Sequence, residues 1–138
     1  MKVARTTIQA AISHASTTVR VDQAIADITL DQVDAIVVVG GMGAVTYLMK
    51  DERLRNLHIT ASRSNKVVSA ICIAPAVLGQ AGVLRNREVN CFSAKTIMNI
   101  LKLNGATYLD KDIVVSERIV SENGPKAAKS SRSKYLSK

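Results

Sequence analysis

The sequence predicts an α/β protein built on a mostly parallel sheet. Two continuous apolar runs carry this prediction, at residues 35–39 and 67–71. Short runs without polar alternation are typical of strands buried on both faces, as in parallel sheets covered by helices. Glycines follow the first run and an Ala-Pro pair follows the second, and each marks a change to a helical apolar pattern.

The length and composition of the chain fit a single domain. A chain of 138 residues with 47% apolar and 22% charged residues can bury one core without disulfides or metals. We expect one domain over residues 1–138, in which 126–138 form a basic, loosely packed tail. That tail holds five basic residues and no acid, so the rest of the chain carries only +3 of the net charge of +8.

The composition argues against nucleic-acid and membrane partners. Aromatic residues make up 3% of the chain, so few side chains can stack on bases, and no recognition motif accompanies the basic residues. No apolar run approaches the roughly 20 residues of a membrane helix, and the first residues lack a signal-peptide pattern. We expect a cytoplasmic protein that binds neither membranes nor, in a specific way, nucleic acid.

The two cysteines do not form a metal-binding pattern. Cys72 and Cys91 lie in different strand-like runs, and neither has a second cysteine or a histidine at a ligand spacing. We predict no metal site and no cofactor. Because cytoplasmic thiols stay reduced, we interpret Cys91 as a buried small apolar residue and expect no structural disulfide.

The chain before the first apolar run predicts a hairpin. Residues 3–12 and 17–21 alternate in polarity on either side of a turn at 13–16, and a short connection leads on to the run at 35–39.

A helix is predicted between the two apolar runs. Apolar residues from 43 to about 64 fall near one helical face, and Asp51 is a position at which the helix can restart. The preceding Gly40, Gly41 and Gly43 leave two alternatives. Either they end the strand at a positive φ, or their N–H groups line an anion pocket.

The rest of the chain alternates helices and strands. The predicted order is a helix at 76–84, a strand at 88–92, a helix at 94–103, a hairpin of strands at 113–115 and 119–121, and a last helix from Gly124-Pro125. That last helix lacks an apolar stripe, so only its first turns are expected to be ordered.

Cys72 is the candidate nucleophile. It ends the second apolar run and precedes the Ala-Pro pair, which predicts a strand-to-helix turn. A side chain at such a turn projects from the carboxyl edge of the parallel strands, where open α/β folds bind ligands. We also expect it to face the first N–H groups of the following helix.

Four stretches resemble the ThiJ/PfpI family, part of the class I glutamine amidotransferase-like superfamily that includes the parkinsonism-associated deglycase proteins. The stretches are residues 33–41, 69–75, 81–84 and 104–108 running through to 123–125. The resemblance implies a flavodoxin-like three-layer αβα sandwich, with Cys72 as a nucleophile elbow in a strained backbone conformation.

The resemblance also implies the residues around Cys72. The backbone N–H groups of Gly41 and Ile73 would form an oxyanion hole. Ile73 stands where many members carry a histidine, and Ala74 stands where a glycine is usual. His14 and His58 are candidate partners for Cys72, with the alternative that each is a surface or packing residue.

Family chains begin with a strand and a helix, and the turn between them provides a glutamate that hydrogen-bonds the cysteine. The resemblance begins at the second strand of the family, after the turn that provides this glutamate. We therefore assign the role of the family glutamate to none of the glutamates at 52, 88, 117 and 122. The first family strand lies inside the sheet, so its place must be filled. We expect residues 3–12 to shift into it or a second copy to pair there, giving a homo-oligomer. A start upstream of Met1 or a truncated remnant is the simpler alternative.

The activity implied by the resemblance is that of an intracellular peptidase, deglycase or glyoxalase on a peptide or small carbonyl substrate. We expect it to be impaired without the family glutamate. The alternative is a non-catalytic redox or stress-response protein, in which Cys72 is oxidised reversibly, or an inactive oligomeric remnant.

Overall fold

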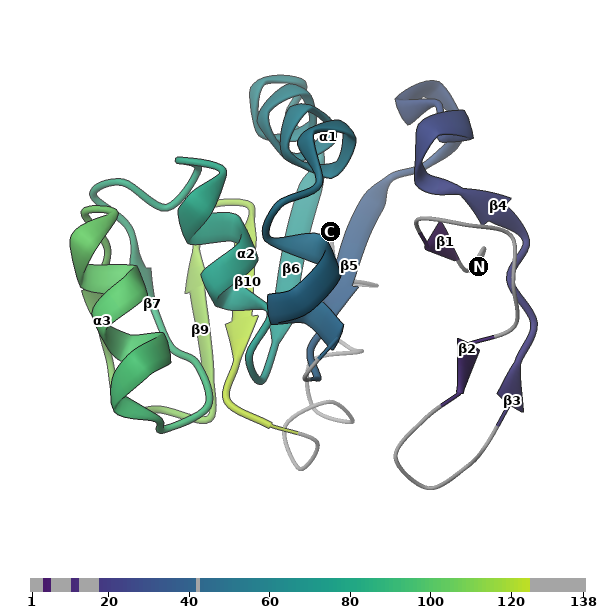
Figure 1. Ribbon diagram of the computed structural model, residues 1–138. Helices are drawn as coiled ribbons and strands as arrows, with labels where there is room; N and C mark the ends of the chain where they lie inside the picture. Colours follow the sequence, from purple (N-terminus) through teal and green to yellow (C-terminus); the bar gives the residue numbers. More distant parts are fainter. Residues whose placement is uncertain (1–3, 6–10, 13–17, 42, 125–138) are drawn as a thin grey trace.

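The computed structural model describes residues 4–5, 11–12, 18–41 and 43–124 (Figure 1). Its centre is a four-stranded sheet in the order β5-β6-β10-β9. The strands are β5 (Ala35–Val39), β6 (Val67–Ile71), β9 (Ile113–Ser116) and β10 (Ile119–Glu122). The first three in spatial order are parallel, and β9 joins β10 as an antiparallel hairpin. The predicted α/β fold with a mostly parallel sheet is confirmed.

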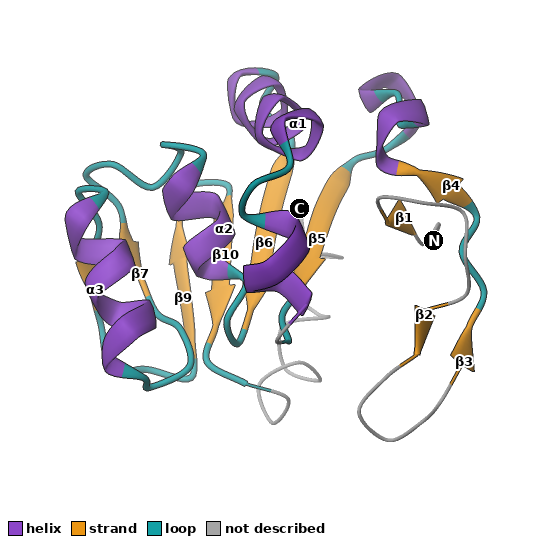
Figure 2. Cartoon of the chain, in the orientation of Figure 1, coloured by secondary structure: helices purple, strands orange, loops and turns teal. Residues whose placement is uncertain are grey.

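Three helices lie on one side of this sheet (Figure 2). They are α1 (Glu52–Arg63), α2 (Pro75–Gln80) and α3 (Lys95–Leu103). A π-helix, η3 (Ala44–Leu48), precedes α1. The predicted restart at Asp51 is confirmed, because its Oδ1 accepts the N–H groups of Arg53 and Leu54 at 2.9 and 3.1 Å.

Alternate sheet positions face these helices. Val38 pairs with Ala70 and Val68 pairs with Ile119, and paired residues point to the same face. Each large apolar side chain buried there stabilises the fold by about 1.5–3 kcal/mol. The core that joins sheet and helices includes Val38, Val68, Ala70, Ile119, Ala61, Leu78 and Leu101.

Short strand pairs flank the central sheet. β1 (Ala4–Arg5) pairs in parallel with β4 (Gln23–Ala24), and β2 (Ala11–Ile12) pairs antiparallel with β3 (Thr18–Val19). The second pair confirms the predicted first hairpin. A third pair joins β7 (Glu88–Val89) to β8 (Thr107–Tyr108) in parallel. β4 and β8 were not predicted, since two residues are too few for a recognisable alternation.

Two short 3-10 turns, η1 (Ile25–Asp27) and η2 (Leu30–Gln32), lead into β5. The predicted last helix and the basic tail lie outside the described residues, apart from Gly124.

One edge of β5 is unpaired among the described strands, because β5 bonds only to β6. Two valines beside this edge are exposed, Val37 by 49% and Val39 by 69%, whereas Ser69, which pairs with Val37 on β6, is fully buried. We expected residues 3–12 to move into the unpaired position beside β5. This expectation is wrong for the residues of that segment that the structure describes. β1 and β2 pair with β4 and β3 instead.

The first prediction concerns Gly40, which lies where β5 ends against the turn after β6. A Cβ at Gly40 would stand 2.5 Å from the Ile71 oxygen and 2.7 Å from the Ile73 nitrogen, whereas one at Gly41 would meet nothing within 4 Å. Gly40→Ala should therefore lower the free energy of unfolding by about 1–3 kcal/mol. Gly41→Ala should change it by about 0.5 kcal/mol or less. Urea unfolding checks this, and equal midpoints for the two variants would contradict the close approach.

His58 is a packing residue of α1. Its side chain is fully buried, and within the described part of the chain neither ring nitrogen has a hydrogen-bond partner. Burial lowers the pKa of His58 to about 4, from an ordinary value of 6.5. The imidazole is therefore neutral in the folded protein at neutral pH.

The second prediction follows from that pKa. Between pH 6.5 and 4 the unfolded chain binds a proton at His58 that the folded chain does not, so stability falls as the pH falls through this window. The full loss from this one group is about 3 kcal/mol. His58→Leu should remove this part of the pH dependence and leave that of the carboxylates. Urea unfolding at pH 7, 5.5 and 4.5 gives the free energy of unfolding at each pH. If this free energy falls equally with pH in the wild type and in His58→Leu, the prediction is refuted.

Candidate functional site

Cys72 lies directly after β6, in the left-handed region of backbone space. Its φ is 65°, one of four positive values at described non-glycine residues. Two of the other three belong to asparagines, which tolerate this region, whereas a cysteine gains no local hydrogen bond from it. The conformation costs on the order of 1–3 kcal/mol and persists only where its surroundings hold it. The strained backbone that the resemblance implied is present at Cys72.

Neighbouring segments hold the Cys72 backbone on both sides. Its N–H donates to the Glu122 oxygen at the end of β10, at 2.8 Å. Its carbonyl accepts the Phe92 N–H from the segment after β7, at 2.7 Å. Within the turn, the Ala74 N–H donates to the Ile71 oxygen at 3.1 Å. Three hydrogen bonds and the close approach of Gly40 thus fix the direction in which the Cys72 side chain leaves the backbone.

The structure places the end of β5 against the same turn. Gly40 contacts the backbone of residues 71–74 so closely that only glycine fits, and Gly41 follows it. Neither glycine has a positive φ; among the described glycines only Gly82 and Gly105 do. The alternative that these glycines end the strand at a positive φ is therefore wrong. A glycine is required at position 40 because the backbone there lies too close to the Cys72 turn for a Cβ atom.

The two backbone donors named by the resemblance are both free to bind a ligand. Within the described part of the chain, the N–H groups of Gly41 and Ile73 donate to no protein acceptor. The carbonyl groups of the same residues are occupied, accepting from Ala44 at 2.9 Å and Ala76 at 3.1 Å. Unpaired N–H groups at such a turn suit an oxygen anion.

The following helix contributes less than expected. Pro75 begins α2 and has no N–H, and the N–H groups of Ala76 and Val77 already donate to the carbonyls of Ile73 and Ala74. The expectation that Cys72 faces free helix N–H groups is therefore not met for these residues. Donors at this site come from the turn and the end of β5.

Glu122, to which the sequence assigned no role, contacts the Cys72 turn. It ends β10 with only 2% of its surface exposed, and its carbonyl accepts the Cys72 N–H. The signal available was its place directly after the predicted strand at 119–121 and immediately before Asn-Gly-Pro.

Of the two histidine candidates only His58 is described, and it has no hydrogen bond to Cys72. His58 is buried in α1 without a hydrogen bond, and His14 lies outside the part of the chain that the structure describes. No group of three histidine, cysteine or acidic side chains among the described residues could hold a metal. None of the described helices is long and apolar enough to cross a membrane.

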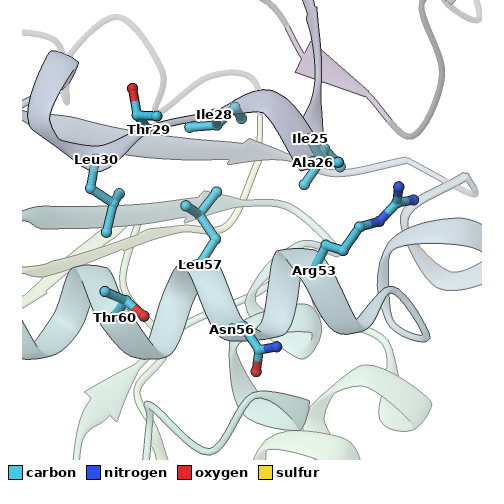
Figure 3. A pocket seen from close by; sticks show the side chains of 9 residues that line it. All are labelled: Ile25, Ala26, Ile28, Thr29, Leu30, Arg53, Asn56, Leu57 and Thr60. Atoms are coloured by element: carbon cyan, nitrogen blue, oxygen red, sulfur yellow. The ribbon is translucent and has the colours of Figure 1, made fainter.

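A hollow of about 460 Å³ lies away from this turn, between α1 and the η1–η2 segment (Figure 3). Ile25, Leu30 and Leu57 line it, and Arg53 stands at one end. Cys72 is not among its lining residues. It therefore offers apolar surface but none of the groups that the Cys72 turn provides.

Comparisons with known proteins agree with this fold. A ThiJ/PfpI domain protein from Brachyspira murdochii has the same fold, with a TM-score of 0.92 at 26% identity over 99% of this chain and 77% of that one. An uncharacterized protein of Methanocaldococcus jannaschii is 36% identical over 111 residues, which are 80% of this chain and 54% of that protein.

Several of the similar proteins carry functional names, among them a cysteine protease, deglycases and a glyoxalase. A deglycase of Thermococcus kodakarensis is 33% identical over 108 residues, 78% of this chain and 63% of the relative. A glutathione-independent glyoxalase of Caenorhabditis elegans is 31% identical over 107 residues, 78% of this chain and 55% of the relative. This chain thus spans between about half and two-thirds of the length of these three curated relatives.

The model of the DJ-1/PfpI family matches residues 2–138. The match includes all four stretches on which the ThiJ/PfpI resemblance rested, at 33–41, 69–75, 81–84 and 104–108 running through to 123–125. The flavodoxin-like α/β fold is confirmed with it. The chain belongs to the DJ-1/PfpI family.

Proposed function

We propose that the chain is a cysteine-centred enzyme of the deglycase and glyoxalase type, acting on small carbonyl compounds or the adducts they form. One observation carries the proposal: the half-buried Cys72 occupies a strained turn, at which the N–H groups of Gly41 and Ile73 have no acceptor among the described residues. The names of the two relatives support the same class of substrate.

In this proposal the Cys72 sulfur adds to the carbonyl carbon of the substrate. A carbon–sulfur bond forms, the carbonyl π bond breaks, and its electron pair moves to the oxygen. The N–H groups of Gly41 and Ile73 donate to that oxygen as its charge develops. Ile73 stands where many family members carry a histidine, so the proton must come from water or from another group.

The third prediction tests this role. The wild-type chain should consume methylglyoxal, and Cys72→Ala should reduce the rate by on the order of 100-fold or more, because the covalent step is lost. Cys91→Ala is the matched control: it removes the other thiol from a buried position and should keep most of the activity. Circular dichroism shows whether both variants fold. Equal activity in wild type and a folded Cys72→Ala variant would refute the proposal.

We also propose that the chain forms homo-oligomers in the cytoplasm, through the unpaired edge of β5. Val37 and Val39 expose apolar surface beside strand N–H and C=O groups that no described strand pairs. A second copy can cover both by adding a strand or an apolar face there.

The fourth prediction tests this edge. Val39→Lys should shift the assembly toward monomers, because a charge must then be buried at the interface. Leu103→Lys on α3, where the leucine is 86% exposed, should leave the assembly unchanged. Light scattering coupled to size-exclusion chromatography gives the molar mass. A wild-type chain that stays monomeric at high concentration would rule the edge out as a self-association site.

A further inference from the structure

The structure brings the two cysteines of the chain together, although they belong to different segments. Cys72 follows β6, and Cys91 comes two residues after β7. The hydrogen bond of 2.7 Å from the Phe92 N–H to the Cys72 carbonyl ties the Cys91–Phe92 peptide directly to Cys72. With standard bond lengths this bond keeps the two Cα atoms roughly 5–7 Å apart. That separation overlaps the range in which disulfides form, about 4.4–6.8 Å.

The two thiols differ in access to solvent. Cys72 is half-buried and can be reached by a small oxidant, whereas Cys91 is fully buried and cannot. An oxidant must therefore act on Cys72 first. Cys91 is the neighbouring thiol that could react with the oxidised Cys72 without any approach from solvent.

The electrostatics of Cys91 also indicate that the sulfurs are neighbours. Burial raises the pKa of the Cys91 thiol, and the negative charge of the Cys72 thiolate raises it further, to about 11. A charge at Cys72 can act on Cys91 in this way only over a short distance. Both free cysteines are reduced in the structure.

We propose that Cys72 and Cys91 are a reversible redox pair, in which Cys91 traps oxidised Cys72 as an intramolecular disulfide. Hydrogen peroxide oxidises the Cys72 thiol to a sulfenic acid and is itself reduced to water. The Cys91 sulfur then attacks the Cys72 sulfur, the S–O bond breaks, and the hydroxyl leaves as a second water with the Cys91 proton. A small dithiol reverses the reaction and is oxidised to its own disulfide.

The pair would protect the Cys72 sulfur. A sulfenic acid that is not trapped is oxidised by more peroxide to a sulfinic acid, a change that is normally irreversible. While the disulfide is present, the Cys72 sulfur cannot act as a nucleophile. Reduction of the disulfide restores it. The pairing does not depend on the proposed carbonyl chemistry, and its products are measured by mass, so failure of one proposal is distinguishable from failure of the other.

The fifth prediction is that dilute wild-type protein treated with limited peroxide loses both thiols and gives a peptide linked between Cys72 and Cys91. Dithiothreitol should restore both thiols. In Cys91→Ala the same treatment should give about tenfold more Cys72 sulfinic acid, because the trapping thiol is absent. In Cys72→Ala, Cys91 should stay reduced, since peroxide does not reach it.

The pH dependence gives a second measurement on the unmutated chain. Trapping requires the Cys91 thiolate, and burial raises the pKa of that thiol, so once Cys72 is a sulfenic acid the disulfide should form faster as the pH rises from 7 to 9. In both experiments, peptide mapping without reduction measures the disulfide-linked peptide and the Cys72 sulfinic acid. Equal sulfinic acid in wild type and Cys91→Ala, or a disulfide only between separate chains, would overturn the proposal.

Discussion

The site depends on one constraint, the left-handed turn at Cys72. A cysteine in this conformation stores strain, and the chain offsets it by fixing both sides of the residue. β10 accepts the Cys72 N–H, and the segment after β7 donates to its carbonyl. β5 then approaches so closely that Gly40 has no room for a Cβ. Three parts of the chain, distant in sequence, therefore determine where one sulfur points.

The same constraint assembles the surroundings of the sulfur. Because β5 ends against the turn, the Gly41 N–H lies near that of Ile73, and neither donates to a described protein acceptor. Because the segment after β7 bonds to Cys72, Cys91 lies next to it. A site for carbonyl addition and a partner for oxidation thus follow from the hydrogen bonds that hold the turn. The strain is compensated by contacts that also bring functional groups together.

Much of the fold could be predicted from the sequence, because its signals are local. The apolar runs at 35–39 and 67–71 predicted β5 and β6, and the helix predicted at 94–103 is α3. The two-residue strands β4 and β8 were missed, because their pairing partners, not their own residues, make them strands. The position of Cys72 followed from the break between two patterns, and the family resemblance supplied the roles of Gly41 and Ile73.

What the sequence could not give was spatial proximity. Nothing in a single chain indicates that Cys91 is tied to Cys72, that Glu122 is buried beside the turn, or that Gly40 is required for close approach instead of a positive φ. His58 illustrates the reverse case. Its residue type made it a candidate partner for the thiol, and the structure buries it in the packing of α1.

Site-resolved alkylation tests most directly the claim that the turn presents Cys72 as the reactive thiol. The folded chain is treated with iodoacetamide at pH 7.5, and labelling of each cysteine is followed by peptide mass spectrometry. The account predicts rapid labelling of Cys72, no labelling of Cys91 until the chain is unfolded, and slower labelling of Cys72 in Gly40→Ala, where the turn is distorted. Labelling of both cysteines at the same rate in the folded chain would contradict it.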